Sequence, residues 1–119
     1  MTQTLIKILG TNATATGSTI TIDLADFKHQ DGTQMLDSPA TASVAKKIAT
    51  LIAGIHQNAK AAKDASGIEI VDKTDVLVSL ESFTPKAFEV RQDTAQIKHE
   101  FNFSVYTVDS TNFDPDNAI

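Results

Sequence analysis

The fold is decided by residues 38–67, which read SPATASVAKKIATLIAGIHQNAKAAKDASG. Ser38 followed by Pro39 is typical of the start of a helix, because serine caps free N–H groups and proline suits the first helical position. Gly67 suits the end of a helix. We therefore expect one helix of about 26 residues, roughly 40 Å long at ~1.5 Å per residue.

Apolar side chains recur at helical spacing within this segment and form one stripe, made of Val44, Ile48, Leu51, Ile52, Ile55, Ala59 and Ala62. We expect this stripe to pack on a sheet of the same chain. A second stripe beside it is made of small residues, with Lys46 next to it: Ala42, Ala45, Ala49 and Ala53. These alanines favour three interpretations: good helix formers on an exposed face, a contact with another subunit, or packing under the loop of residues 26–38.

Strands are predicted on both sides of the helix. Residues 4–9 are apolar and β-branched, and residues 18–25 alternate between apolar and polar, so these two segments predict a hairpin. After Gly67, residues 68–71, 76–80, 87–92 and 97–108 again read as strands, with turns between them. The predicted order is β-β-α-β-β-β. This order indicates a two-layer α+β fold, with one long amphipathic helix on a mostly antiparallel sheet of about five strands.

Length and charge limit the class of protein. The 119 residues suit one domain, which we place at residues 1–108, followed by an acidic tail at residues 109–119. The chain has no cysteine and a net charge of -5, so we expect no disulfide and no nucleic-acid partner. It has no signal-peptide pattern and no apolar run of membrane-spanning length. We expect no membrane association, and a location in the cytoplasm or in a virion or similar particle.

The tail carries a few residues that could bind a neighbouring subunit. Phe113 is an isolated apolar residue, and Asp114 and Asp116 lie beside it. Residues 38–63 contain four lysines and no acid, so the tail of one copy could bind the helix of another through opposite charges. The alternative is a solvated, frayed terminus. The candidate interface is therefore Ala42, Ala45, Lys46, Ala49, Ala53, Phe113, Asp114 and Asp116.

No pattern in the sequence predicts catalytic, cofactor-binding or metal-binding residues. His29, His56 and His99 do not have the spacing of a metal pair. The loop with Asp26, His29, Asp31 and Asp37 could gather carboxylates around a histidine, but acid–base chemistry would also require a pocket. There is no phosphate-binding loop and no nucleophile elbow.

These observations favour a non-catalytic structural or assembly subunit that acts by self-association, for example in a phage head or tail or a similar particle. The expected partners are copies of the same chain or other subunits of the assembly. Two alternatives stay open. One is a small ligand-binding or regulatory domain, and the other is an enzyme with a site shared across a dimer interface.

Overall fold

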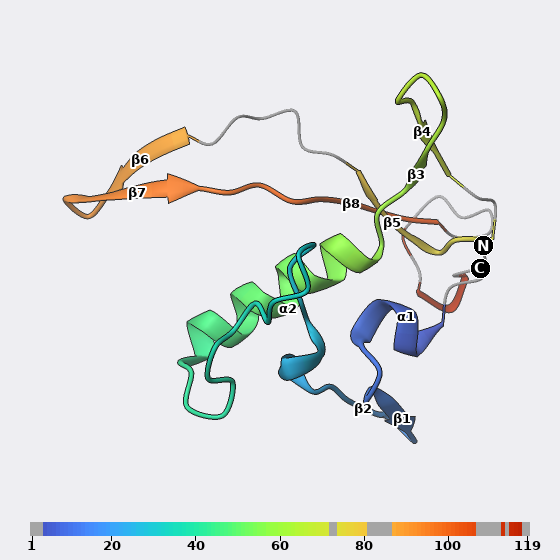
Figure 1. Cartoon of the computed structure of the whole chain (residues 1–119), viewed down its shortest axis with the longest axis horizontal. Coiled ribbons are helices and arrows are strands. Elements are labelled where there is room, and N and C mark those ends of the chain that lie inside the picture. The colour runs from blue at the N-terminus through green and yellow to red at the C-terminus, as the bar shows by residue number, and fades with distance from the viewer. Residues whose placement is uncertain (1–3, 72–73, 81–86, 107–112, 114, 118–119) are drawn as a thin grey trace.

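The computed structural model describes residues 4–71, 74–80, 87–106, 113 and 115–117. In the part of the chain that the structure describes, the α-helices lie in the N-terminal half of the sequence and most strands in the C-terminal half (Figure 1). In chain order the elements are α1 (Leu5–Leu9), β1 (Thr14–Thr16), β2 (Thr19–Thr21), the 3-10 helix η1 (Leu24–Asp26), α2 (Val44–Asn58), β3 (Ala62–Lys63), β4 (Glu69–Ile70), β5 (Leu77–Leu80), β6 (Ala87–Arg91), β7 (Thr94–Lys98), β8 (Asn102–Val105) and the 3-10 helix η2 (Pro115–Asn117).

Helix α2 begins later than the sequence predicts. Its N-cap is Ser43, whose hydroxyl oxygen accepts a hydrogen bond from the Lys46 N–H at 3.3 Å. Ser38 instead opens a turn, in which the Thr41 N–H donates to the Ser38 carbonyl at 3.2 Å. Ser38 and Ser43 are both suitable N-cap residues. The helix starts at Ser43, which directly precedes Val44, the first residue of the apolar stripe.

The same helix also ends earlier than predicted, at Asn58, with Ala59 as its C-cap. The residues after Ala59 are not helical because they pair with strand residues elsewhere in the chain. Lys60 forms a parallel bridge with Ser79, and β3 pairs with β4 across a turn at Gly67. The 15 residues of α2 therefore span about 22 Å rather than the expected 40 Å.

The first predicted strand is a helix. Residues 5–9 form α1, capped by Thr4, whose side chain accepts a hydrogen bond from the Lys7 N–H at 3.2 Å. The helix ends at Gly10, which has φ of 105° and donates its N–H to the Ile6 carbonyl. Helix α1 lies against α2, and the Asn58 side-chain amide donates to the Ile8 carbonyl at 2.9 Å. The predicted hairpin between residues 4–9 and 18–25 is therefore wrong.

The N-terminal hairpin instead joins β1 to β2 through a turn at Gly17, which has φ of 58°. Of the strand predicted at residues 18–25, only Thr19–Thr21 form a strand, β2. The strand does not continue because Asp23 caps η1 and accepts a hydrogen bond from the Ala25 N–H. The long loop that follows is folded back on itself: the His29 N–H donates to the Thr33 carbonyl and the Met35 N–H to the Phe27 carbonyl.

The C-terminal strands form a long two-stranded arm. β5 pairs antiparallel with β8, and β6 pairs antiparallel with β7. The turn between β6 and β7 consists of Gln92 and Asp93, with φ of 49° and 64°, as hairpins with two-residue turns require. The strand predicted at residues 97–108 is thus two strands, since β7 starts at Thr94 and β8 at Asn102. Figure 1 shows β6 and β7 projecting away from the rest of the molecule.

The predicted α+β class is confirmed, and the order of elements is roughly as expected. Among the described residues, the strands pair as four two-stranded sheets rather than as one sheet of about five strands. The buried apolar side chains of the described residues are few: Ala13, Phe27, Ala59 and Val78. The predicted boundary between a domain and a tail at residue 108 lies outside the described residues. Within the described part of the chain, no helix combines the length and apolar character needed to cross a membrane.

Candidate interaction surface

The large apolar side chains on the N-terminal half of α2 face solvent. Val44, Ile48 and Ile52 follow one another at every fourth position and are 71%, 53% and 41% exposed, so they form a continuous stripe on one face. We call these three residues the α2 stripe. Contrary to the prediction that these residues pack on a sheet of the same chain, they lie at the surface. Thr50 and Gly54 are the buried residues of α2, and Gly54 lies against the Phe27 ring.

The C-terminal end of α2 contacts the strands of the arm through His56. The His56 imidazole Nε2 lies 3.1 Å from the Leu80 carbonyl oxygen, and its ring meets Phe101 and Phe103 edge-on with centroids 5.3 Å apart. In Figure 1 this end of α2 lies closest to β5 and β8, while its N-terminal end runs away from them. The arm and the N-terminal half of α2, which carries the α2 stripe, therefore diverge from each other.

The structure brings together only part of the predicted alanine surface. Ala42, Lys46 and Ala49 line a hollow of about 540 Å³ between α2 and residues 35–43. Ala45 and Ala49 are exposed, whereas Ala42 and Ala53 are half-buried. The arrangement at the hollow agrees with the interpretation that part of this surface faces the chain's own loop. Ala45 lies next to the α2 stripe and extends its apolar surface.

The tail residues of the candidate interface stay a prediction. Phe113 is exposed, and Asp116 is exposed within η2. Asp114 lies outside the described residues.

The second apolar surface, on the β6–β7 hairpin, was not recognised from the sequence as a candidate site. The antiparallel register places Val90 opposite Ala95, and Ile97 lies two residues further along the same face. Val90 is 74% and Ile97 49% exposed. The alternation of residues 87–92 was visible in the sequence, but it predicted a strand with one face on a core. In the structure that face of the hairpin is open to solvent.

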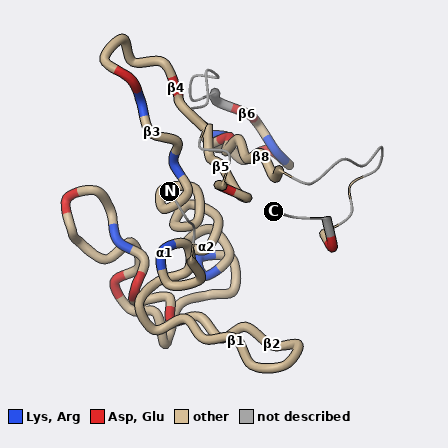
Figure 2. Tube along the Cα trace, turned by 90° about the vertical axis from the view of Figure 1, so that its right-hand side faces the viewer, with Lys and Arg blue, Asp and Glu red and all other residues tan. Residues whose placement is uncertain are grey.

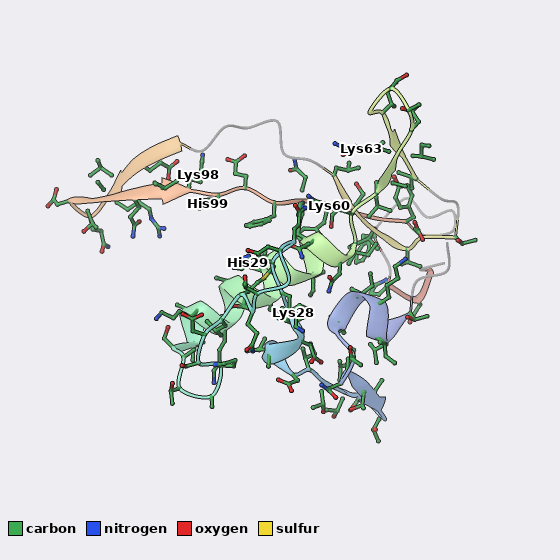
Figure 3. All side chains as sticks on the ribbon, viewed as in Figure 1. Lys28, His29, Lys60, Lys63, Lys98 and His99 are labelled. Carbon is green, nitrogen blue, oxygen red and sulfur yellow. The ribbon has the colours of Figure 1, made fainter. Side chains whose placement is uncertain are left out.

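The opposite face of this hairpin is polar and holds a small ion-pair cluster. The Lys98 ammonium Nζ lies 3.1 Å from Glu89 Oε1 and 3.0 Å from Glu100 Oε1. Hydrogen bonds from Lys98 to Glu100 and Glu89 raise the pKa of the lysine above its usual 10.5. Lys98 and His99 lie together on the arm (Figure 3). The hairpin is therefore amphipathic, with one polar face and one apolar face.

Two carboxylates of the loop at residues 26–38, those of Asp26 and Asp31, have structural partners. Asp26 accepts hydrogen bonds from the Asn12 backbone N–H at 2.8 Å and from its side-chain amide at 2.9 Å. Asp31 accepts from the Thr33 hydroxyl at 2.6 Å and the Thr33 N–H at 3.0 Å, and these bonds lower the pKa of Asp31 below its usual 3.8. The suggested gathering of carboxylates around His29 therefore does not carry a candidate acid–base site.

Charged and metal-ligating residues are dispersed. Figure 2 shows acidic and basic positions spread along the chain rather than gathered on one side. Among the residues that the structure describes, no group of three His, Asp or Glu could hold a metal ion. Comparison with protein-family models, with curated proteins and with solved structures finds no match for this chain.

Proposed function

We propose that this protein is a non-catalytic structural subunit that acts by self-association, as a component of a multi-subunit particle such as a phage head or tail. The observation that carries the proposal is the exposure of the α2 stripe together with Ala45. An apolar helix face is normally buried, and an exposed one on a subunit marks a contact with another protein.

The accessible surface of the chain supports the same proposal. A compact monomer of 12.8 kDa exposes about 6,300 Å², whereas this chain exposes 8678 Å². Its radius of gyration is 16.3 Å, against about 13.5 Å for a compact domain of this length. The excess surface, about 2,400 Å², falls in the range that obligate interfaces bury. We infer that copies of the chain complete one another's core.

The mass of the protein in solution tests this proposal. Light scattering after size exclusion is expected to give a mass that is a multiple of the chain mass. Ile48→Glu places a charge in the middle of the α2 stripe and is expected to shift the mass towards the monomer. The matched control is Ile20→Glu in β2, since Ile20 is 54% exposed and Ile48 is 53% exposed.

The control variant should keep the wild-type mass, because β2 does not belong to the α2 stripe. Far-UV circular dichroism should be the same for both variants and the wild type, which would show that Ile48→Glu acts on association and not on folding. A wild-type protein that stays monomeric across the concentration range would refute the proposal. Equal loss of mass in both variants would refute the role of the α2 stripe.

A further inference from the structure

Strand β8 pairs with β5 along one edge, and its backbone groups on the other edge point away from β5. The Tyr106 N–H donates to the Val76 carbonyl at 2.7 Å, which makes these two residues a hydrogen-bonded pair. Such pairs alternate along an antiparallel ladder, so Ser104 also turns its N–H and C=O towards β5. Phe103 and Val105 turn theirs to the opposite, outer edge. Among the residues that the structure describes, none forms a backbone hydrogen bond to this outer edge.

The outer edge of β5 has the same geometry and is covered. Ser79 lies opposite Phe103 in the register and also points its backbone groups away from the partner strand. Its N–H donates to the Ala59 carbonyl at 2.9 Å, and its carbonyl accepts from the Ala61 N–H at 3.2 Å. The chain thus supplies a third, short strand to β5 and, within its described part, none to β8.

The open edge lacks the features that usually protect such a strand. Residues 101–106 read FNFSVY and contain no charged residue, no proline and no glycine. Exposed edges are usually protected by charged side chains or proline, because their free N–H and C=O groups can pair with another chain. The apolar and aromatic side chains of this segment are exposed: Phe101 by 40%, Phe103 by 39%, Val105 by 46% and Tyr106 by 38%. The edge is therefore suited to receive a further strand.

We propose that β8 of one copy pairs antiparallel with β8 of a second copy, around a two-fold axis at Ser104. The inference rests on the proposed self-association and adds a second contact surface to the α2 stripe. The composition of the strand favours a second copy as the occupant. Short uncharged segments of high β-propensity pair with identical segments, and a strand without charge does not repel its own copy.

The register follows from the two residues of β8 that face outwards. An axis at Ser104 places Phe103 of each copy opposite Val105 of the other, and each such pair exchanges both backbone hydrogen bonds. An aromatic residue opposite a β-branched one is also a favourable cross-strand pair. Ser104 then meets its own copy in a non-hydrogen-bonded pair, in which the two Cα atoms lie about 4.5 Å apart. All the outward backbone groups of Phe103 and Val105 gain partners in this arrangement.

The absence of cysteine from the sequence allows a direct test with single introduced thiols. Ser104→Cys is oxidised under mild conditions, and the disulfide-linked dimer is measured by intact mass spectrometry. A disulfide forms only when the two Cα atoms approach within about 7 Å, which Ser104 and its copy satisfy. The matched control is Asn102→Cys, in the same strand and on the same face, whose two copies would lie about 13 Å apart along the strands.

A mixture of Asn102→Cys with Tyr106→Cys gives a second readout, because these two residues face each other across the same axis. A several-fold higher yield of linked dimer from Ser104→Cys than from Asn102→Cys, together with the mixed disulfide, supports the pairing. An Asn102→Cys yield that equals or exceeds that of Ser104→Cys overturns it. Light scattering on the reduced samples separates the two ideas. An oligomer without preferential linkage at Ser104 refutes the β8 pairing alone, whereas a monomer refutes self-association as well.

Discussion

Gly54 decides how α2 is seated on the rest of the chain, and Gly54→Ala tests this role. A Cβ atom at position 54 would overlap with Phe27 Cδ1 and would lie 2.6 Å from Cγ and 2.9 Å from Cε1. The Phe27 ring is among the largest fully buried side chains in the structure. The added methyl group would therefore meet the body of a buried ring rather than the end of a flexible side chain.

Two effects of opposite sign act on the stability of this variant. Alanine is favoured over glycine in the middle of a helix by about 1 kcal/mol. Forcing an extra carbon into a packed core costs about 1–3 kcal/mol. The added Cβ would lie well inside van der Waals distance of three ring atoms, so we place the cost at the upper end of that range. The expected net loss in the free energy of unfolding is about 1–2 kcal/mol.

Urea denaturation followed by circular dichroism, at one fixed protein concentration, measures this loss. Helix propensity alone predicts a gain in stability for the same variant, so the sign of the change decides. A Gly54→Ala protein more stable than the wild type would refute the close approach of α2 to Phe27. Repeating the substitution in a Phe27→Leu background should reduce its cost, because the smaller side chain leaves room for the methyl group.

Three further predictions concern other local contacts. Ser43→Ala should lower the free energy of unfolding by about 1 kcal/mol, whereas Ser38→Ala should change it little, and equal losses in urea would contradict the helix start described above. Asp26→Ala should cost about 1–3 kcal/mol because it removes both hydrogen bonds from Asn12, and Asn12→Ala should cost less in the same assay, since its backbone N–H keeps its partner. The raised pKa of Lys98 means that the ion-pair cluster stabilises the hairpin below pH 10.5 and that this contribution is lost as the pH rises through the folded-state pKa. Methyl NMR shifts of the hairpin should therefore change above pH 10.5 in the wild type and not in Lys98→Met.

The centre of the helix could be predicted from the sequence, and its ends could not. Periodicity placed residues 44–58 in a helix correctly, because apolar spacing persists over several turns there. The predicted start of the helix was wrong because Ser38 and Ser43 both suit an N-cap. The end failed because residues 59–63 are good helix formers that pair with distant strands instead. Such pairing depends on tertiary contacts, which local propensity does not contain.

The short N-terminal apolar run illustrates a different limit. Leu5, Ile6, Ile8 and Leu9 surround a single lysine, so both the helical and the strand period fit the segment. A run of this length does not discriminate between the two by pattern alone. Thr4 as an N-cap and Gly10 at the C-terminal end were the available signals for a helix.

The sequence shows the residues of the α2 stripe as an apolar helix face, but the interface predicted from it was the alanine stripe with Lys46 and the tail residues, not the α2 stripe. The sequence identified an apolar stripe and a small-residue stripe on one helix and assigned the large side chains to the chain's own sheet. In the structure the small and polar side of α2, with Thr50 and Gly54, faces the rest of the chain. Close approach to Phe27 requires a residue without a side chain, and only one residue of the helix meets this requirement. The rotation of α2 therefore follows from Gly54 rather than from its largest apolar residues.

This rotation has an energetic consequence that supports assembly. Full burial of a valine or isoleucine side chain stabilises a protein by about 1.5–3 kcal/mol relative to exposure. Val44, Ile48 and Ile52 each keep roughly half of their surface or more in water, so a few kcal/mol per copy are released only when something covers them. A rotation of α2 that turned this stripe inwards would move Gly54 away from Phe27, so the helix cannot bury both faces against the same neighbours. A layer added on the outer side of α2 covers the stripe while Gly54 stays in place, so the proposed self-association gains this burial at no cost to the contact with Phe27.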